Sequence, residues 1–159
     1  MLNFLNFMRY DDLFIRVDIS KFLWNKKPIL SHSILVWDLE NISYKNLKTI
    51  KNKVTYSPEK LYIVTKQKLS KRNRFKMEME GFKILDLHKS ISDEKIISVM
   101  NLYSMYSNMI LISSDSDFVS VAKRYLKNNN LQWIMNDKNK KRILMKMDIT
   151  EKNLRITTI

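Results

Sequence analysis

Cysteine is absent from this sequence of 159 residues. Without cysteine the chain has no disulfide framework, no thiolate nucleophile and no zinc site built on sulfur ligands. The absence fits a reducing compartment, so the cytoplasm is the predicted location.

Glycine occurs once, at Gly81. The phosphate-binding loops of the Rossmann and Walker types need several glycines, because their backbone approaches the phosphates closely. The sequence therefore excludes nucleotide binding of those two kinds. Gly81 follows a helical pattern and precedes an apolar run, so we expect it to end a helix in the left-handed conformation.

Long apolar runs are also missing. No stretch approaches the roughly 20 apolar residues of a membrane span. The apolar start of the chain meets Asp11 and Asp12 before any small-residue cleavage site. We therefore expect neither membrane insertion nor secretion. An apolar fraction of 45% with 28% charged residues is typical of a folded domain, and the length predicts a single core.

Acidic residues are scarce beside basic ones: 16 Asp and Glu stand against 29 Lys and Arg, a formal net charge of +13. This excess favours an anionic partner. Nucleic acid is the first candidate, because dispersed Lys and Arg side chains that neutralise its phosphates release bound counterions, and this release favours binding. The chain is also rich in Lys, Asn and Ile, a bias that an AT-rich genome would produce without any functional cause.

Five short apolar runs alternate with helical patterns along the chain. Runs of this length that are rich in Ile, Val, Leu and aromatic residues predict strands buried on both faces. Crossovers through helices make such a sheet parallel. We therefore predict an α/β three-layer sandwich with a central parallel sheet. The expected strands span residues 32–39, 60–66, 82–87, 108–113 and 131–135.

The two ends of the chain are predicted differently. Residues 1–31 form an N-terminal extension, in which the alternation of residues 13–20 is compatible with an added edge strand. Residues 32–159 form the domain itself, and its last residues read as a short helix followed by a strand or a tail.

Acidic residues stand where the first and fourth predicted strands end. Asp38 closes the first strand and is followed by Asn41, and Asp115 and Asp117 follow the fourth. If these strands are neighbours, their ends form the crevice in which open α/β sheets bind ligands. Crowded carboxylates raise one another's pKa unless a cation is present. Oxygen ligands without His or Cys suit Mg²⁺ or Mn²⁺.

Each of these residues also has a purely structural reading. Ser114, Asp115 and Asp117 are suitable caps for the helix that follows them. Asn41 is typical of a turn. Asp93 and Glu94 open another predicted helix, where the helix dipole favours acids. Asp38 is harder to explain in this way, because a carboxylate that ends a buried apolar run usually has a partner.

Two segments resemble the NYN domain family. The stretch "SILVWDLENI" resembles the first-strand motif of that family, an apolar run followed by Asp, two residues and Asn. The stretch "LISSDSDFVSVAKRYLKN" is similar to its "SGDSDF" motif with the amphipathic helix that follows, although Ser114 stands where the family usually has glycine. The similarity covers roughly residues 32–150. It implies a PIN-like sheet of order 3-2-1-4-5 and metal-dependent cleavage of RNA.

Carried over by position, the resemblance implies a set of site residues. Asp38, Asp93, Asp115 and Asp117 would be the catalytic acids that hold Mg²⁺ or Mn²⁺, supported by Asn41 and Ser113. "KSISDEKI" fits the family pattern around Asp93 only loosely. The implied reaction is hydrolysis of RNA by metal-activated water, which leaves 5′-phosphate and 3′-hydroxyl ends.

Basic segments follow the second and fifth predicted strands and should emerge beside the acids. Their residues are candidates for holding an RNA backbone, although any single lysine among them could simply be a solvated side chain. The first segment carries Lys66, Lys68, Lys71, Arg72 and Arg74, and the second carries Lys138, Lys140, Lys141 and Arg142.

The expected function is thus that of a metal-dependent endoribonuclease. Its main alternative is a non-catalytic nucleic-acid-binding module on the same fold. A PIN-type toxin and a metal-using nucleotide-sugar transferase are further readings, but "SDSDF" fits the NYN pattern better, and the chain is short for a separate acceptor pocket. A homodimer that widens the basic groove is compatible with all of this.

Overall fold

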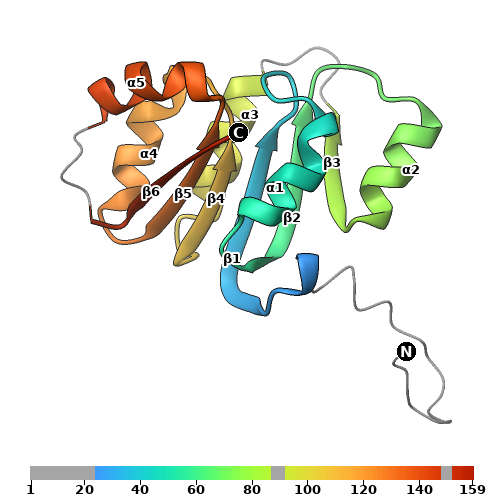
Figure 1. Cartoon of the computed structure of the whole chain (residues 1–159), viewed down its shortest axis with the longest axis horizontal. Coiled ribbons are helices and arrows are strands. Elements are labelled where there is room, and N and C mark those ends of the chain that lie inside the picture. The colour runs from blue at the N-terminus through green and yellow to red at the C-terminus, as the bar shows by residue number, and fades with distance from the viewer. Residues whose placement is uncertain (1–23, 87–91, 148–151) are drawn as a thin grey trace, which may run out of the picture.

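The computed structural model of the chain describes residues 24–86, 92–147 and 152–159 (Figure 1). Six of its strands form one sheet in the order β3-β2-β1-β4-β5-β6, and every neighbouring pair is parallel. The strands are β1 (Ile29–Asp38), β2 (Ser57–Thr65), β3 (Phe82–Asp86), β4 (Asn108–Ile112), β5 (Asn130–Met135) and β6 (Leu154–Thr158). The predicted order of the first five strands and the parallel pairing are confirmed.

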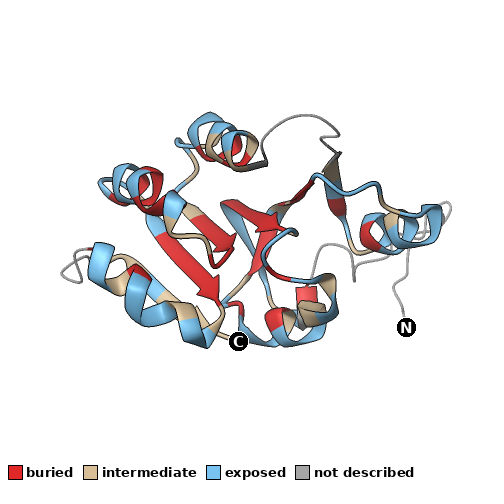
Figure 2. Cartoon of the chain, turned by 90° about the horizontal axis from the view of Figure 1, so that it is seen from above, coloured by how far each residue is buried: buried red, intermediate tan, exposed pale blue. Residues whose placement is uncertain are grey.

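Helices connect the parallel strands and cover both faces of the sheet (Figures 1 and 2). The α-helices are α1 (Leu47–Lys53), α2 (Lys71–Met79), α3 (Ser92–Leu102), α4 (Val119–Leu126) and α5 (Asp137–Lys146), and three short 3₁₀ helices are η2 (Trp24–Lys26), η3 (Tyr44–Asn46) and η4 (Ser116–Phe118). In Figure 1, α5 lies across the carboxyl ends of β5 and β6. The chain thus has an α/β fold of the predicted class.

Two hydrophobic clusters fill the space between the sheet and its helices. Side chains alternate between the faces of a strand, so Ile34 and Val36 of β1 join the cluster formed with α3 and α4. Leu35 and Trp37 join the cluster formed with α1 and α2. Figure 2 shows buried residues concentrated in the central strands and exposed ones on the outer sides of the helices.

The sheet is one strand larger than the five-stranded sheet expected from the sequence. β6 pairs in parallel with β5, from Leu131 beside Leu154 to Met135 beside Thr158. Its sequence, "LRITT", is short and only half-buried, which is why its pattern could not be told from that of a tail. The alternating segment 13–20 lies outside the described residues.

The start of the domain also differs from the expected boundary. β1 begins at Ile29, and Trp24 is 1% exposed within the core. The Trp24 ring packs edge-on against Phe82, with 5.5 Å between ring centroids. Residues 24–31, assigned from the sequence to an extension, therefore take part in the packing of the domain.

Gly81 ends α2 as predicted. Its φ is 96°, and its N–H donates to the carbonyl of Glu78 at 2.9 Å. A side chain at this φ would strain the backbone, so glycine is the residue that allows β3 to start directly after the helix.

Within residues 24–86, 92–147 and 152–159, no helix has the length and apolar character needed to span a bilayer.

Candidate metal centre

The parallel register of β1 and β4 places Asp38 beside Ser113. Trp37 pairs with Ile112, so the next residue of each strand faces the α3 and α4 side, like Ile34 and Val36. The Ser113 hydroxyl donates to Asp38 Oδ2 at 2.9 Å. Both residues are fully buried. The carboxyl ends of these two strands are therefore joined by a buried hydrogen bond between side chains.

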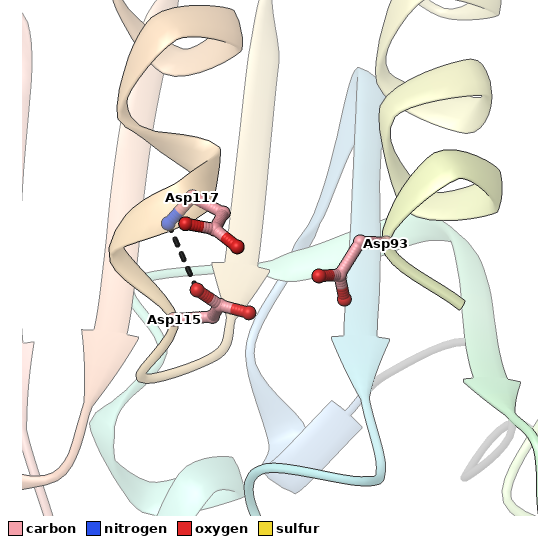
Figure 3. Close-up of side chains that lie close together, drawn as sticks. All are labelled: Asp93, Asp115 and Asp117. Carbon is pink, nitrogen blue, oxygen red and sulfur yellow. Dashed lines mark hydrogen bonds between the residues drawn. The ribbon is translucent and has the colours of Figure 1, made fainter. Parts of the chain in front are cut away.

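Three further carboxylates gather at the same edge of the sheet. Asp115 and Asp117 belong to the turn after β4, and Asp93 lies in the first turn of α3. One oxygen from each of the three carboxylates lies within 4.8 Å of the others. Figure 3 shows the Asp93 and Asp115 carboxylates pointing toward one another from the two sides of the site.

The capping role proposed for Asp115 is present together with the cluster. Its Oδ1 accepts a hydrogen bond from the Asp117 backbone N–H at 2.8 Å and caps η4. Ser114, by contrast, does not cap this helix; its hydroxyl oxygen accepts from the Asn136 N–H at 2.9 Å. Capping uses only one oxygen of Asp115, so the same side chain can serve the turn and the site.

Two of the carboxylates, those of Asp93 and Asp38, have a raised pKa. For Asp93, burial comes first, followed by the negative charges of Asp115 and Asp38, and together with smaller contributions they raise its pKa to about 6. Burial also raises the pKa of Asp38, with the charge of Asp115 adding to it, while hydrogen bonds from Ser113 and Asn41 oppose the rise. These mutual effects place Asp38 within electrostatic reach of the other acids.

One oxygen of Asp38 lacks a hydrogen bond of ordinary geometry. Oδ2 accepts from Ser113 and from Asn41 Nδ2, the latter at 2.5 Å. Oδ1 is buried and accepts no hydrogen bond in the structure. Buried polar atoms are nearly always satisfied, so an unpaired carboxylate oxygen calls for an explanation. Within the described residues, no lysine or arginine forms an ion pair with any of the four carboxylates.

The donor set fits a hard divalent cation. It consists of carboxylate oxygens without nitrogen or sulfur ligands, which is the preference of Mg²⁺ and Mn²⁺. Two oxygens that bind one Mg²⁺ at about 2.1 Å are at most about 4.2 Å apart. The 4.8 Å limit within the group of Asp93, Asp115 and Asp117 is therefore close to the required separation, and small side-chain rotations would close the difference.

All six residues predicted for the site from the sequence lie at or beside it, either within the close group of acids or around Asp38. Asp93, Asp115 and Asp117 form the close group, and Asp38 stands beside it without being a member. Ser113 and Asn41 both hold Asp38, so both supporting residues contact the acid that they were expected to support. That all four acids hold the ion remains a prediction.

The predicted basic residues lie on both sides of the acids. β2 is the neighbour of β1 and β5 is the neighbour of β4, so the segments that follow β2 and β5 leave the sheet at the same edge as the cluster. Arg74 is half-buried, and the exposed members are Lys66, Lys68, Lys71, Arg72, Lys138, Lys140, Lys141 and Arg142.

Two structural supports were not found from the sequence. The Glu40 carboxylate accepts hydrogen bonds from the Thr65 hydroxyl and from the Lys66 and Gln67 N–H groups, at 2.7 to 3.3 Å. Trp133 Nε1 donates to the Ser113 carbonyl at 2.8 Å. Glu40 thus ties the turn after Asp38 to the start of the first basic segment. In the sequence, the signal for this role is the acidic residue Glu40 within "DLEN". Its hydrogen-bond partners could not be predicted, because they lie at the end of β2 and just after it.

Replacing Ser113 with alanine should destabilise the protein by about 1–3 kcal/mol. The substitution removes a donor to buried Asp38 and the oxygen that accepts from the Asp115 N–H at 3.1 Å. Urea unfolding in EDTA measures the loss. Ser98→Ala is the matched control, because the exposed Ser98 hydroxyl only donates to the Glu94 carbonyl of its own helix. Equal effects of the two substitutions would contradict the role of Ser113.

Without divalent ions, the carboxylate of Asp93 should make folding less favourable as pH rises from 4 to 6. Its pKa is about 6 in the folded protein against 3.8 ordinarily, so the folded state holds the proton more tightly in this window. In EDTA, the stability of Asp93→Asn relative to the wild type should therefore grow between pH 4 and 6 and then level off. Urea midpoints at several pH values test this, and a constant difference would contradict it.

Comparison with known proteins identifies a fold but no family. No family model matches the chain, and no curated protein matches it. Among solved structures, a protein of unknown function from Vibrio parahaemolyticus RIMD 2210633 is similar, with a TM-score of 0.58 and 16% sequence identity. The match covers 91% of this chain and 96% of that one. At this identity the likeness shows a shared fold alone.

Proposed function

We propose that this protein is a metal-dependent ribonuclease with a PIN-like fold, similar to the NYN domains. The observation that carries the proposal is the meeting of Asp93, Asp115 and Asp117 beside buried Asp38, whose Oδ1 has no hydrogen-bond partner. Asp38, Asp93 and the Asp115 and Asp117 pair come from three separate parts of the sequence, and the mutual repulsion of their charges opposes folding unless a cation binds.

The four carboxylates would hold one or two Mg²⁺ or Mn²⁺ ions. A bound ion would lower the pKa of a water molecule and stabilise the charge that develops on the phosphate. Ser113 and Asn41 keep Asp38 Oδ2 in place and so leave Oδ1 free for the ion. The Asp117 N–H does the same for Asp115 by engaging its Oδ1.

The basic segments on either side of the acids would hold the RNA backbone. Apart from half-buried Arg74, their cations stand on exposed positions after β2 and β5, where they would neutralise the phosphates of the RNA. Glu40 fixes the first of these segments through the Lys66 N–H. Binding of this kind weakens as salt concentration rises.

A cleavage assay tests the proposal. The purified protein is incubated with labelled single-stranded RNA or DNA of the same sequence, in Mn²⁺, Mg²⁺ or EDTA. We expect cleavage of RNA with either metal and none in EDTA. The new 5′ ends should accept a label only after phosphatase treatment, because hydrolysis by water leaves a 5′-phosphate. RNA that binds with salt dependence but is never cut would instead favour a non-catalytic nucleic-acid-binding module.

A further inference from the structure

A lysine at the end of α5 contacts the turn that carries two of the acids. Lys146 Nζ donates a hydrogen bond to the Ser116 hydroxyl oxygen at 3.3 Å. Ser116 opens η4 and stands between Asp115 and Asp117, and consecutive Cα atoms are only about 3.8 Å apart. Lys146 was not among the basic residues predicted from the sequence, because its partner is 30 positions away. The contact places a cation beside the candidate metal centre.

Packing fixes the last turn of α5 against η4. Ile143 and Met147 are buried in the same hydrophobic cluster as Phe118 of η4. Lys146 stands three positions after Ile143, on a neighbouring part of the same helix face, and its own side chain is exposed. The helix dipole favours a lysine in this last turn, but it does not direct the ammonium group toward Ser116. The packing of α5 on η4 therefore sets the position of Lys146 beside the acids.

The acidic turn meets residues of opposite charge from two helices. Asp115 and Asp117 group with Asp93 of α3. Ser116, between them, contacts Lys146 of α5 instead. Among the described residues, the Lys146 ammonium group forms no ion pair with a carboxylate, and its partner is a neutral hydroxyl. The site thus combines oxygen ligands for a cation with a neighbouring positive charge that is available to an anion.

Lys146 and Ser116 present several hydrogen-bond donors together. An ammonium group has three N–H donors, and the bond to Ser116 uses one of them. The Ser116 hydroxyl accepts this bond through its oxygen and keeps its own proton for another acceptor. A positive charge with adjacent donors complements a phosphate group, which carries negative charge on several acceptor oxygens.

We infer that Lys146 and Ser116 together bind the phosphodiester group next to the one that is cut. The inference rests on the proposed function and adds a second phosphate-binding subsite to its metal centre. A strand whose reacting phosphate lies at an ion beside Asp115 and Asp117 would bring a neighbouring phosphate within reach of Lys146. Such a contact is made to the backbone alone and carries no sequence information. It should therefore be the same for RNA and for DNA.

The salt dependence of binding tests this subsite. Labelled oligonucleotides of one sequence, as RNA and as DNA, are titrated with the full chain in EDTA, where no cleavage is expected. Lys146→Ala should weaken binding of both about 3- to 10-fold, as expected for one lost hydrogen bond. It should also lower the slope of log Kd against log salt concentration by about 0.7, the value for one phosphate contact in a single strand. Lys146→Arg should retain most of the affinity, because arginine keeps the charge.

Lys127→Ala is the matched control for the loss of charge. Lys127 is an exposed lysine at the end of α4, and β5 starts soon after it at Asn130. It therefore lies at the edge of the sheet opposite the acids, and its substitution should leave affinity and slope close to those of the wild type. Equal losses for Lys127→Ala and Lys146→Ala would overturn the inference, because net charge alone would then explain them. A loss confined to RNA would overturn it as well.

A double-mutant cycle tests whether Lys146 and Ser116 bind the same phosphate. Ser116→Ala alone should weaken binding about 2- to 10-fold. The double variant should lose less than the product of the two single losses, because residues that share one partner are not independent. Losses that multiply, or an unchanged slope for Lys146→Ala, would contradict a shared subsite. All of these measurements are made in EDTA and cleavage is scored separately with metal, so failure of the subsite and failure of nuclease activity are distinguishable.

Discussion

Asp115→Asn should reduce metal-dependent RNA cleavage by about a thousandfold or more, which corresponds to about 4 kcal/mol of transition-state stabilisation. The substitution removes one negative charge from the close group of Asp93, Asp115 and Asp117. The asparagine oxygen can still accept from the Asp117 N–H, as Asp115 Oδ1 does at 2.8 Å. The turn should therefore keep its shape, and the loss of activity would report the charge alone.

The control for this prediction is Glu59→Gln, which makes the same chemical change at the opposite end of the sheet. Glu59 accepts a hydrogen bond from the His32 N–H at 2.8 Å, which glutamine can also do. Its neighbour Lys60 pairs with Ile34, four positions before Asp38 on β1, a distance of about 13 Å. Initial rates in Mn²⁺ should be equal for this variant and the wild type. Cleavage by Asp115→Asn at the wild-type rate would remove the acids from the mechanism.

Manganese ions should raise the melting temperature of the wild type and leave that of Asp115→Asn nearly unchanged. At a concentration of 100 times Kd, a ligand that binds only the folded state adds about 2.7 kcal/mol of stability, which is about 5–10 °C for a domain of this size. In EDTA at pH 7.5 the melting temperature of Asp115→Asn should lie above that of the wild type. The variant lacks one of the negative charges that repel the carboxylate of Asp93 and raise its pKa.

Thermal unfolding of both proteins, followed by circular dichroism in EDTA and in Mn²⁺, tests the reversal. Glu59→Gln should again behave as the wild type in both conditions. A melting temperature that rises equally in Mn²⁺ for the wild type and Asp115→Asn would mean that the ion binds elsewhere. A wild type that does not respond to Mn²⁺ or Mg²⁺ at millimolar concentrations would contradict the candidate metal centre itself.

Much of the fold could be predicted from the sequence, because the short apolar runs of the strands and the helical patterns between them are both clear. The apolar runs that became β1, β4 and β5 are buried along most of their length, and short apolar runs separated by helical patterns are typical of strands covered on both faces. β6 was predicted only as a strand or a tail, since its residues are half-buried and give a weak pattern. Trp24 escaped prediction because its place in the core depends on Phe82, which is distant in the sequence.

The candidate site divides in the same way. The sequence predicted which acids follow the strands, since Asp38 and Asp115 stand directly at strand ends. It could not tell whether Asp93 opens a helix only for the sake of the helix dipole or also faces Asp115. That question depends on how α3 packs across the sheet, and the structure brings the two carboxylates together (Figure 3). Glu40 was missed for the same reason, because its partners are Thr65, the last residue of β2, and Lys66, which follows that strand.

By itself, the sequence determined the alternation of strands and helices, the strand ends at which the acids stand, and the positive charge of the chain, because these follow from local pattern and composition. Only the tertiary structure decided which acids share a site. The register of β1 and β4 sets Ser113 against Asp38, and that contact engages one oxygen of Asp38 and leaves the other buried without a donor. The register depends on packing between residues 75 positions apart, which no local pattern encodes.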